Sequence, residues 1–117
     1  MQNLEQIRAG NALQPASQLD RSAVNKLPAM ILSNGLLAAG AFCNAEGGGA
    51  NRPGMKSALE ATARHLVHRG LLDDRNGTVS GMIEDLSGRN SVHLQRATAE
   101  ALAFLAYLKR FAPKRDN

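Results

Sequence analysis

Two histidines, His65 and His68, have the spacing in this 117-residue sequence that most resembles a chemical site. They lie three positions apart in a segment with helical periodicity, at which two imidazoles can share a metal ion. A zinc site needs three or four ligands, and neither the lone Cys43 nor a carboxylate stands at an offset that completes one. The pair is therefore interpreted as ordinary surface or half-buried histidines, and we expect no metal.

Other chemically capable residues form no catalytic or cofactor-binding pattern. Glu84 and Asp85 are adjacent, and neighbours on a helix diverge by about 100°, so they are interpreted as solvated charges. The glycines at 47–49 lack the Gly-Lys-Ser/Thr ending and the preceding strand of a phosphate-binding loop. We therefore expect no enzymatic activity and no cofactor. A metal-free ribonuclease that uses His65 and His68 stays open as a weaker alternative, because imidazole titrates near neutral pH.

The basic excess of the chain lies at its C-terminal end. The sequence holds 14 Lys and Arg against 10 Asp and Glu, which gives a net charge of +4. Residues 1–88 carry eight side chains of each sign, whereas residues 89–117 carry six basic and two acidic ones and hence the whole excess. Such an asymmetry indicates a polyanionic partner, usually a nucleic acid or an acidic protein face.

Composition and periodicity predict an all-α protein. Aromatic residues make up only 3% of the chain, and no stretch alternates apolar and polar residues over six positions. We expect a compact bundle of about five to six helices with a long C-terminal helix, forming a single helical domain over 1–112 with a basic tail at 113–117. A glycine-rich loop is predicted at 46–54. The expected helices cover residues 3–14, 20–26, 28–44, 57–70, 79–87 and 91–112.

Proline, glycine and capping residues set the expected limits of these helices. The first is expected to end before Pro15, and the capping-box pattern at 57–60 predicts the start of the fourth. The segment 28–44 is apolar nearly all round, so it is predicted to be the buried central helix. Gly35 and Gly40 inside it are expected to allow close approach of a neighbouring helix.

The last expected helix combines an apolar seam with a basic outer face. The seam residues recur at spacings of three and four, which predicts packing on another helix of the domain or of a second subunit. Arg96 and Arg110 are two heptads apart and share an outward face, separated by about 21 Å at a rise of ~1.5 Å per residue. Tyr107 lies in the adjacent column of this basic stripe. The seam consists of Leu94, Ala97, Ala101, Phe104, Leu108 and Phe111.

Three segments together resemble the small α-helical subunit of the type III-B CRISPR (Cmr) RNA-silencing complex. They are LEQIRA at 4–9, KLPAMILSNGL at 26–36 and RATAEALAFLAYLKRFA at 96–112. They follow the family's order and span most of the chain, although the glycine-rich stretch at 46–54 does not align. The resemblance implies a helical, non-catalytic subunit. Several copies of it stand in a row beside the backbone subunits, along the groove where guide and target RNA pair.

The resemblance also implies partners and contact residues. The expected partners are the backbone and large subunits of the Cmr complex, further copies of this chain, and the guide RNA/target RNA duplex through the assembled complex. Matched segments contain Arg96, Lys109 and Arg110, and Lys26 heads the central one. Arg64 and Arg69 are added from charge alone, and Tyr107 from its place in the stripe. The candidate nucleic-acid-binding residues are thus Arg96, Lys109, Arg110, Lys26, Arg64, Arg69 and Tyr107.

A small helical DNA-binding regulator is the main alternative function. The turn at 70–78 permits a helix-turn-helix interpretation in which residues 79–87 form the recognition helix. That helix contains Glu84 and Asp85 and no Lys or Arg, which disfavours contact with phosphates.

The cysteine content and the lengths of the apolar stretches indicate the cell compartment of the protein. Cys43 alone cannot form an internal disulfide, which fits a reducing cytoplasm. The longest apolar stretch, 36–43, is far shorter than the ~20 residues of a membrane span. We therefore expect a cytoplasmic protein without membrane association.

Overall fold

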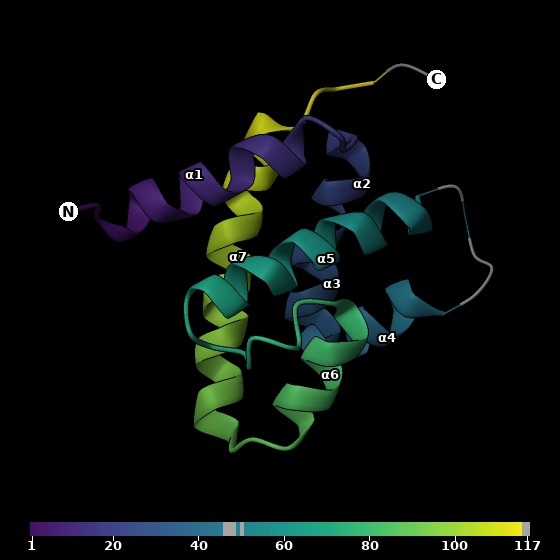
Figure 1. The fold of residues 1–117 in the computed structure, drawn as a ribbon. Helices are drawn as coiled ribbons and strands as arrows, with labels where there is room; N and C mark the ends of the chain where they lie inside the picture. Colours follow the sequence, from purple (N-terminus) through teal and green to yellow (C-terminus); the bar gives the residue numbers. More distant parts are fainter. Residues whose placement is uncertain (46–48, 50, 116–117) are drawn as a thin grey trace.

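The long C-terminal helix α7 (Ser91–Phe111) is the axis of the fold in this computed structural model (Figure 1). The structure describes residues 1–45, 49 and 51–115, and within these the chain forms seven helices and no strand. The all-α class and the long final helix are therefore confirmed. The other helices are α1 (Leu4–Ala16), α2 (Arg21–Asn25), α3 (Leu27–Asn34), α4 (Leu36–Asn44), α5 (Arg52–His68) and α6 (Val79–Ser87).

Local sequence accounts for the length of α7 and for its buried face. The Asn90 side chain accepts a hydrogen bond from the His93 backbone N–H at 2.8 Å and so caps the first turn. The helix ends just before Pro113, which cannot continue it. Most of the predicted seam lies in the core, although Phe111 is exposed at the end of the helix. The buried members of the seam are Ala97, Ala101, Phe104 and Leu108.

Two helix limits differ from the predictions. Helix α1 runs through Pro15 to Ala16, and its final turn is closed by bonds from the N–H groups of residues 17 and 18 to the carbonyls of residues 14 and 15. The expected end before Pro15 was wrong by two residues: the proline removes one i→i−4 bond, and these bonds beyond it still close the turn. Helix α5 begins at Arg52, five residues before the predicted capping box at Ser57, with a proline in its first turn. The predicted loop was therefore too long, and its residues 46–48 and 50 lie outside the described residues.

The predicted helix at 28–44 is divided at Gly35 into α3 and α4. Gly35 has φ of 96°, a left-handed conformation that favours glycine, and a Cβ added there would meet nothing within 4 Å. Its role is thus to turn the chain, and the expected close helix approach at this position was wrong. At Gly40 the expectation is confirmed, because an added Cβ would lie 3.2 Å from the Ile83 side chain of α6.

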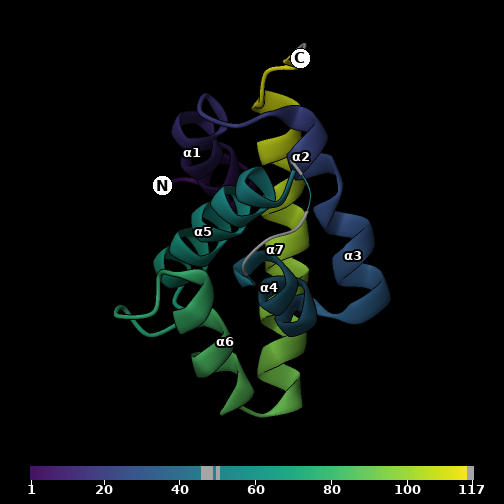
Figure 2. The same cartoon turned by 90° about the vertical axis from the view of Figure 1, so that its right-hand side faces the viewer.

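Helices α3 and α4 are only half-buried, and the prediction of a buried central element was wrong. Leu32 is 74% exposed and Phe42 is 41% exposed, whereas Ile31 and Leu36 are buried. The division at Gly35 gives each short helix its own inner face, so side chains on the outer faces reach the surface. Figure 2 shows α3 and α6 on opposite sides of α7, the helix that takes the central position.

An acidic side chain fixes the segment before α6. Asp85 accepts hydrogen bonds from the Asp73 backbone N–H at 2.7 Å, from Asn76 Nδ2 at 3.1 Å and from Arg89 Nε at 2.7 Å. Its side chain is 5% exposed, so the interpretation of Asp85 as a solvated charge was wrong. Glu84, its neighbour, is exposed as expected.

Cys43 is buried in the core, as expected of a small apolar side chain, and burial raises the pKa of its thiol. In the part of the chain that the structure describes, every helix is too short or too polar to cross a membrane.

Candidate nucleic-acid interface

Three basic residues of α7 project outward, and we call Arg96, Lys109 and Arg110 the outer cations. All three are exposed. Within residues 1–45, 49 and 51–115, no carboxylate forms an ion pair with any of them. Cations in this state keep their full charge available for a ligand, because no internal carboxylate competes for them.

Arg96 lies in a hollow that also contains two arginines from other elements. We call this hollow of about 330 Å³ the arginine pocket. Arg8 comes from α1, Arg69 is the C-cap residue of α5, and Arg96 comes from α7. The structure therefore brings together Arg69 and Arg96, two predicted contacts 27 positions apart in the sequence. The lining residues are Leu4, Arg8, Arg69, Leu71, Arg96, Ala99 and Glu100.

Lys109 and Arg110 line a second hollow, of about 680 Å³, at the C-terminal end of α7. This C-terminal groove has a basic rim, completed by Arg21, and an apolar floor that includes the exposed Leu32. The predicted basic stripe is thus divided between two hollows, with Arg96 in one and Arg110 in the other. The lining residues are Arg21, Pro28, Leu32, Leu102, Ala106, Lys109 and Arg110.

The remaining predicted contacts lie apart from one another. Tyr107 is half-buried where α1 packs on α7, and its hydroxyl donates a 3.4 Å hydrogen bond to Glu5. Lys26, between α2 and α3, is exposed beside a hollow that also contains Phe42. Arg64 is exposed on α5 and lines the hollow that holds both histidines.

A buried carboxylate on α7 joins three helices, a feature that the sequence did not reveal. Glu100 Oε1 accepts from Arg8 Nη2 at 2.8 Å, and Glu100 Oε2 accepts from Arg8 Nε at 2.9 Å. The same Oε2 lies 2.8 Å from Nε2 of His65, whose ring stacks on Phe104 with centroids 4.3 Å apart. Glu100 therefore ties α1 and α5 to the central helix through a two-pronged arginine pair and an imidazole.

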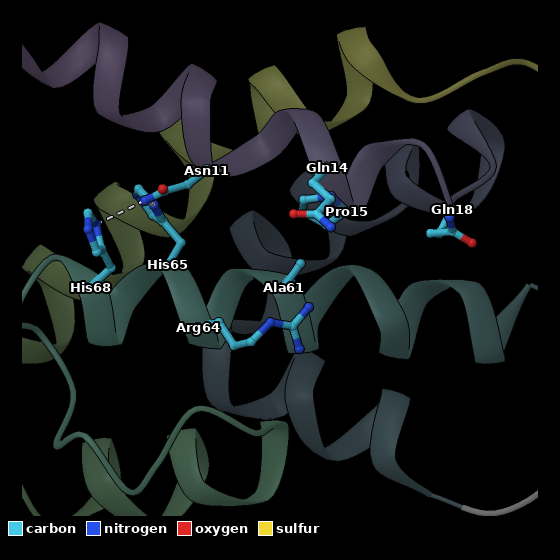
Figure 3. A pocket seen from close by; sticks show the side chains of 8 residues that line it. All are labelled: Asn11, Gln14, Pro15, Gln18, Ala61, Arg64, His65 and His68. Carbon is cyan, nitrogen blue, oxygen red and sulfur yellow. Dashed lines mark hydrogen bonds between the residues drawn. The ribbon is translucent and has the colours of Figure 1, made fainter.

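Asn11 completes this Glu100 network, which consists of Glu100, Arg8, His65, Asn11 and His68. Asn11 Nδ2 lies 3.0 Å from Nδ1 of His65 and 3.0 Å from Nδ1 of His68 (Figure 3). An amide nitrogen has two hydrogens, so it can donate one to each ring only if both Nδ1 atoms are unprotonated. His65 consequently carries its proton on Nε2 and donates it to Glu100.

Burial and pairing shift the ionisation of the network in a consistent way. Hydrogen bonds from Arg8 lower the pKa of Glu100 to about 2, against an ordinary value of 4.5. Desolvation lowers the pKa of His65, and this outweighs the opposing effect of Glu100. At neutral pH the network therefore contains an ionised Glu100, a charged Arg8 and a neutral His65.

This geometry does not support acid–base catalysis by the two histidines. His65 is 2% exposed and both of its ring nitrogens are engaged, while Nδ1 of His68 is engaged by Asn11. Among the described residues, no three His, Cys, Asp or Glu side chains gather where they could hold a metal ion. The hollow beside these histidines, about 540 Å³ in volume, is lined mostly by polar side chains of α1 and α5.

Helix α6 has no DNA-reading face in this structure. It buries Val79, Met82 and Leu86, and its inner carboxylate, Asp85, is occupied by the preceding turn and by Arg89. A recognition helix needs cations that face phosphates, and α6 contains none.

The structure adds Arg8 and Arg21 to the predicted cations. Arg8 lies inside the matched segment 4–9, so the resemblance held a signal for it, which the concentration of charge at 89–117 obscured. For Arg21 the sequence held none, since its proximity to Lys109 depends on how α2 packs on α7.

Comparison with known protein families agrees with the resemblance of the three sequence segments. A family model described as "CRISPR-associated protein (Cas_Cmr5)" matches residues 3–114, which include all seven helices and every candidate contact. No curated protein and no solved structure gives a significant match. The chain therefore belongs to the Cas_Cmr5 family of CRISPR-associated proteins, as a small subunit of the type III-B Cmr complex.

Proposed function

We propose that this chain is a non-catalytic structural subunit of the type III-B ribonucleoprotein effector in antiviral RNA silencing in the cytoplasm. Several copies stack in a row along the backbone subunits and contact the large subunit. Each copy contributes positive charge to the groove that holds the guide RNA/target RNA duplex. Target cleavage then belongs to other subunits of the complex.

The observation that carries the proposal is how the charges are divided between internal and external use. Six carboxylates of the described residues accept hydrogen bonds from other groups of the chain, and these bonds link helices and turns. The outer cations have no such partner in the described part of the chain. The excess charge is thus presented outward. The engaged carboxylates are Glu5, Asp20, Glu60, Asp73, Asp85 and Glu100.

The charge of one copy is too small for tight binding of RNA alone, which supports a role within an assembly. Affinity for a nucleic acid grows with the number of phosphates that are neutralised, and it falls steeply with salt. Copies in a row would add their contacts along one duplex, with little dependence on base sequence, because phosphate contacts carry no sequence information.

The test is RNA loading by the assembled complex with Arg96→Gln/Lys109→Gln/Arg110→Gln. We expect weaker binding of target RNA and a shallower dependence on salt, because up to three phosphate contacts per copy are removed. Filter binding at several salt concentrations measures both quantities.

A control of equal charge separates location from total charge. Lys56→Glu/Arg75→Gln also lowers the net charge by three, and both residues are exposed and line neither of the hollows that contain the outer cations. We expect near-normal loading by this control. Unchanged loading by the triple variant, in a complex that retains the subunit, would refute the assignment of the outer cations to RNA.

A further inference from the structure

The arginine pocket places three guanidinium groups from three separate elements around one hollow. Arg8, Arg69 and Arg96 line it together with the apolar Leu4 and Leu71. Its volume of about 330 Å³ is roughly ten times the share of one liquid water molecule, so it can admit a small anionic group with its attached atoms. A site of this kind is more specific than an exposed cation, because its parts come from different helices and are held by their packing.

The one carboxylate of the pocket does not neutralise Arg69 or Arg96. Both oxygens of Glu100 are engaged, Oε1 by Arg8 and Oε2 by Arg8 and His65. Arg8 uses Nε and Nη2 for this pair, which leaves Nη1 and one hydrogen of Nη2 for another acceptor. With His65 neutral, the described residues leave two positive charges of the pocket uncompensated.

The side chain of Arg69 contains a buried hydrogen-bond donor. Its Nε–H is buried and has no hydrogen-bond acceptor among the described residues. A buried donor without a partner costs about 1–3 kcal/mol, and an acceptor oxygen that reached this N–H would remove that cost. The positive charge of Arg69 also contributes to the lowered pKa of His65, so the guanidinium lies close to the Glu100 network.

These observations fit a phosphodiester better than a protein carboxylate. Guanidinium forks match the paired oxygens of a phosphate, and apolar walls strengthen the attraction. A protein segment would also need exposed apolar area to bury, and none of the exposed large apolar residues of the described chain lines this pocket. Those residues are Met1, Leu13, Leu32, Phe42, Val92 and Phe111.

We propose that the arginine pocket binds one phosphodiester group of the guide or target RNA backbone. Arg69 and Arg96 make the contacts, and Arg8 is held in place for a third contact by Glu100. This proposal rests on the proposed function and identifies one contact of each copy with the RNA. The pocket reads no base, so its contribution is the same for every RNA sequence.

The test uses the complete reconstituted complex with Arg69→Gln/Arg96→Gln. We expect target RNA to bind roughly tenfold more weakly, as for the loss of a charge-assisted hydrogen-bonded contact. The plot of log affinity against log salt should become shallower, and its slope should change by about 0.7–0.9 for each copy that loses one phosphate contact. The control Lys56→Gln/Arg75→Gln removes the same charge from exposed residues outside the pocket and should change neither quantity.

A chemical change in the RNA locates the contact. Neutral methylphosphonate linkages are introduced one at a time along the guide and along the target, and binding is measured with each. One linkage per copy should weaken wild-type binding and have no further effect in Arg69→Gln/Arg96→Gln, since the two changes then remove the same contact. The strand that contains the sensitive linkage, guide or target, is the strand that the pocket contacts.

Urea denaturation of each variant confirms that the fold is retained. Arg69→Lys/Arg96→Lys should restore part of the affinity through charge alone.

Three results overturn the pocket. The first is unchanged affinity and slope for Arg69→Gln/Arg96→Gln while Lys109→Gln/Arg110→Gln weakens binding, which leaves the proposed function standing. The second is release of the folded variant from a complex that holds no RNA, which assigns the pocket to a carboxylate of a neighbouring subunit. The third is unchanged binding by both double variants, which refutes the proposed function as well.

Discussion

The Glu100 network and the outer cations are both built on α7, yet their charges serve opposite purposes. In the network, Glu100 meets Arg8 and His65 at 2.8–2.9 Å, and the carboxylate side chain is 8% exposed. The outer cations Arg96, Lys109 and Arg110 are exposed, and no carboxylate of the described chain pairs with them. One helix thus carries a charged group that holds the fold together and others that the fold does not use.

The difference shows how burial divides charges by role. A buried carboxylate must be hydrogen-bonded, because leaving it without partners costs several kcal/mol, so its partners are fixed. An exposed cation loses little when it stands alone in water, so it stays available for a ligand. The fold should therefore respond to changes in the Glu100 network, and RNA loading to changes in the outer cations.

The largest expected effect on stability is at Glu100. Glu100→Ala leaves Arg8 and the buried His65 without their acceptor, so we expect the free energy of unfolding to fall by about 3 kcal/mol. Urea denaturation measures the change. The control is Glu84→Ala, the same substitution at an exposed carboxylate of α6, which should stay within about 0.5 kcal/mol of the wild type. Equal losses in the two variants would remove the distinction between the regions.

The pH dependence of stability tests the ionisation of the same network. The folded pKa of His65 lies below its ordinary 6.5, and that of Glu100 is about 2 rather than 4.5. On acidification the unfolded chain binds these protons first, so stability falls below about pH 6.5 through His65 and again below about pH 4.5 through Glu100. We expect Glu100 to contribute a loss of about 1.4 kcal/mol between pH 7 and pH 3.5, and His65 to add to this loss.

Two variants separate the two steps of that pH profile. His65→Gln should remove the loss that begins below pH 6.5, and Glu100→Gln should reduce the loss below pH 4.5, as measured by urea denaturation at a series of pH values. The loss that remains in Glu100→Gln comes from Asp20, Asp73 and Asp85, whose pKa values are also lowered. A wild-type profile that is flat from pH 7 to pH 3.5 would contradict the ionisation states assigned to the network.

Asp85 tests whether a second carboxylate that is engaged within the fold also contributes to stability. Asp85→Asn removes the charge that meets Arg89 and one of the acceptor oxygens that fix the turn before α6, so we expect a loss of about 1–2 kcal/mol. Thermal and urea denaturation measure it. The matched control is the exposed Asp74→Asn in the same turn, and a comparable loss there would show that the bonds of Asp85 contribute nothing particular.

The smallest expected effect on stability is at the outer cations. Arg96→Gln/Lys109→Gln/Arg110→Gln should change the free energy of unfolding by no more than about 0.5 kcal/mol, since no ion pair within the described chain is lost. Urea denaturation of the free subunit measures this. A loss of several kcal/mol would show that these residues belong to the internal structure, and the two regions would no longer differ in kind.

Much of the fold could be predicted from local sequence. The limits of α6 and α7 follow from residues next to them in the chain, such as Asn90, Pro113 and Gly88, and they match the predictions closely. The break at Gly35 was missed because nothing in an apolar run distinguishes a glycine that packs from one that turns the chain. Gly40 packs and Gly35 turns, and only their neighbours in space separate the two cases.

The candidate site was predictable only in part. Exposure of Arg96, Lys109 and Arg110 follows from their places on a helix whose opposite face is apolar. Their division between two hollows does not, because Arg69 and Arg21 reach α7 from α5 and α2. The assignment of these residues to RNA stays a prediction until the complexes described above are measured.

The sequence by itself determined the helical class, the apolar seam of α7 and the C-terminal excess of positive charge, because each depends on spacing along a single helix or on simple counts. Tertiary structure alone decided which charges are used inside the fold. Glu100 and Arg8 are 92 positions apart, and no local pattern could reveal that they pair or that Arg69 joins Arg96. Side chains distant in sequence meet only when helices pack, and that packing sets both the burial that fixes one charge and the exposure that leaves another free.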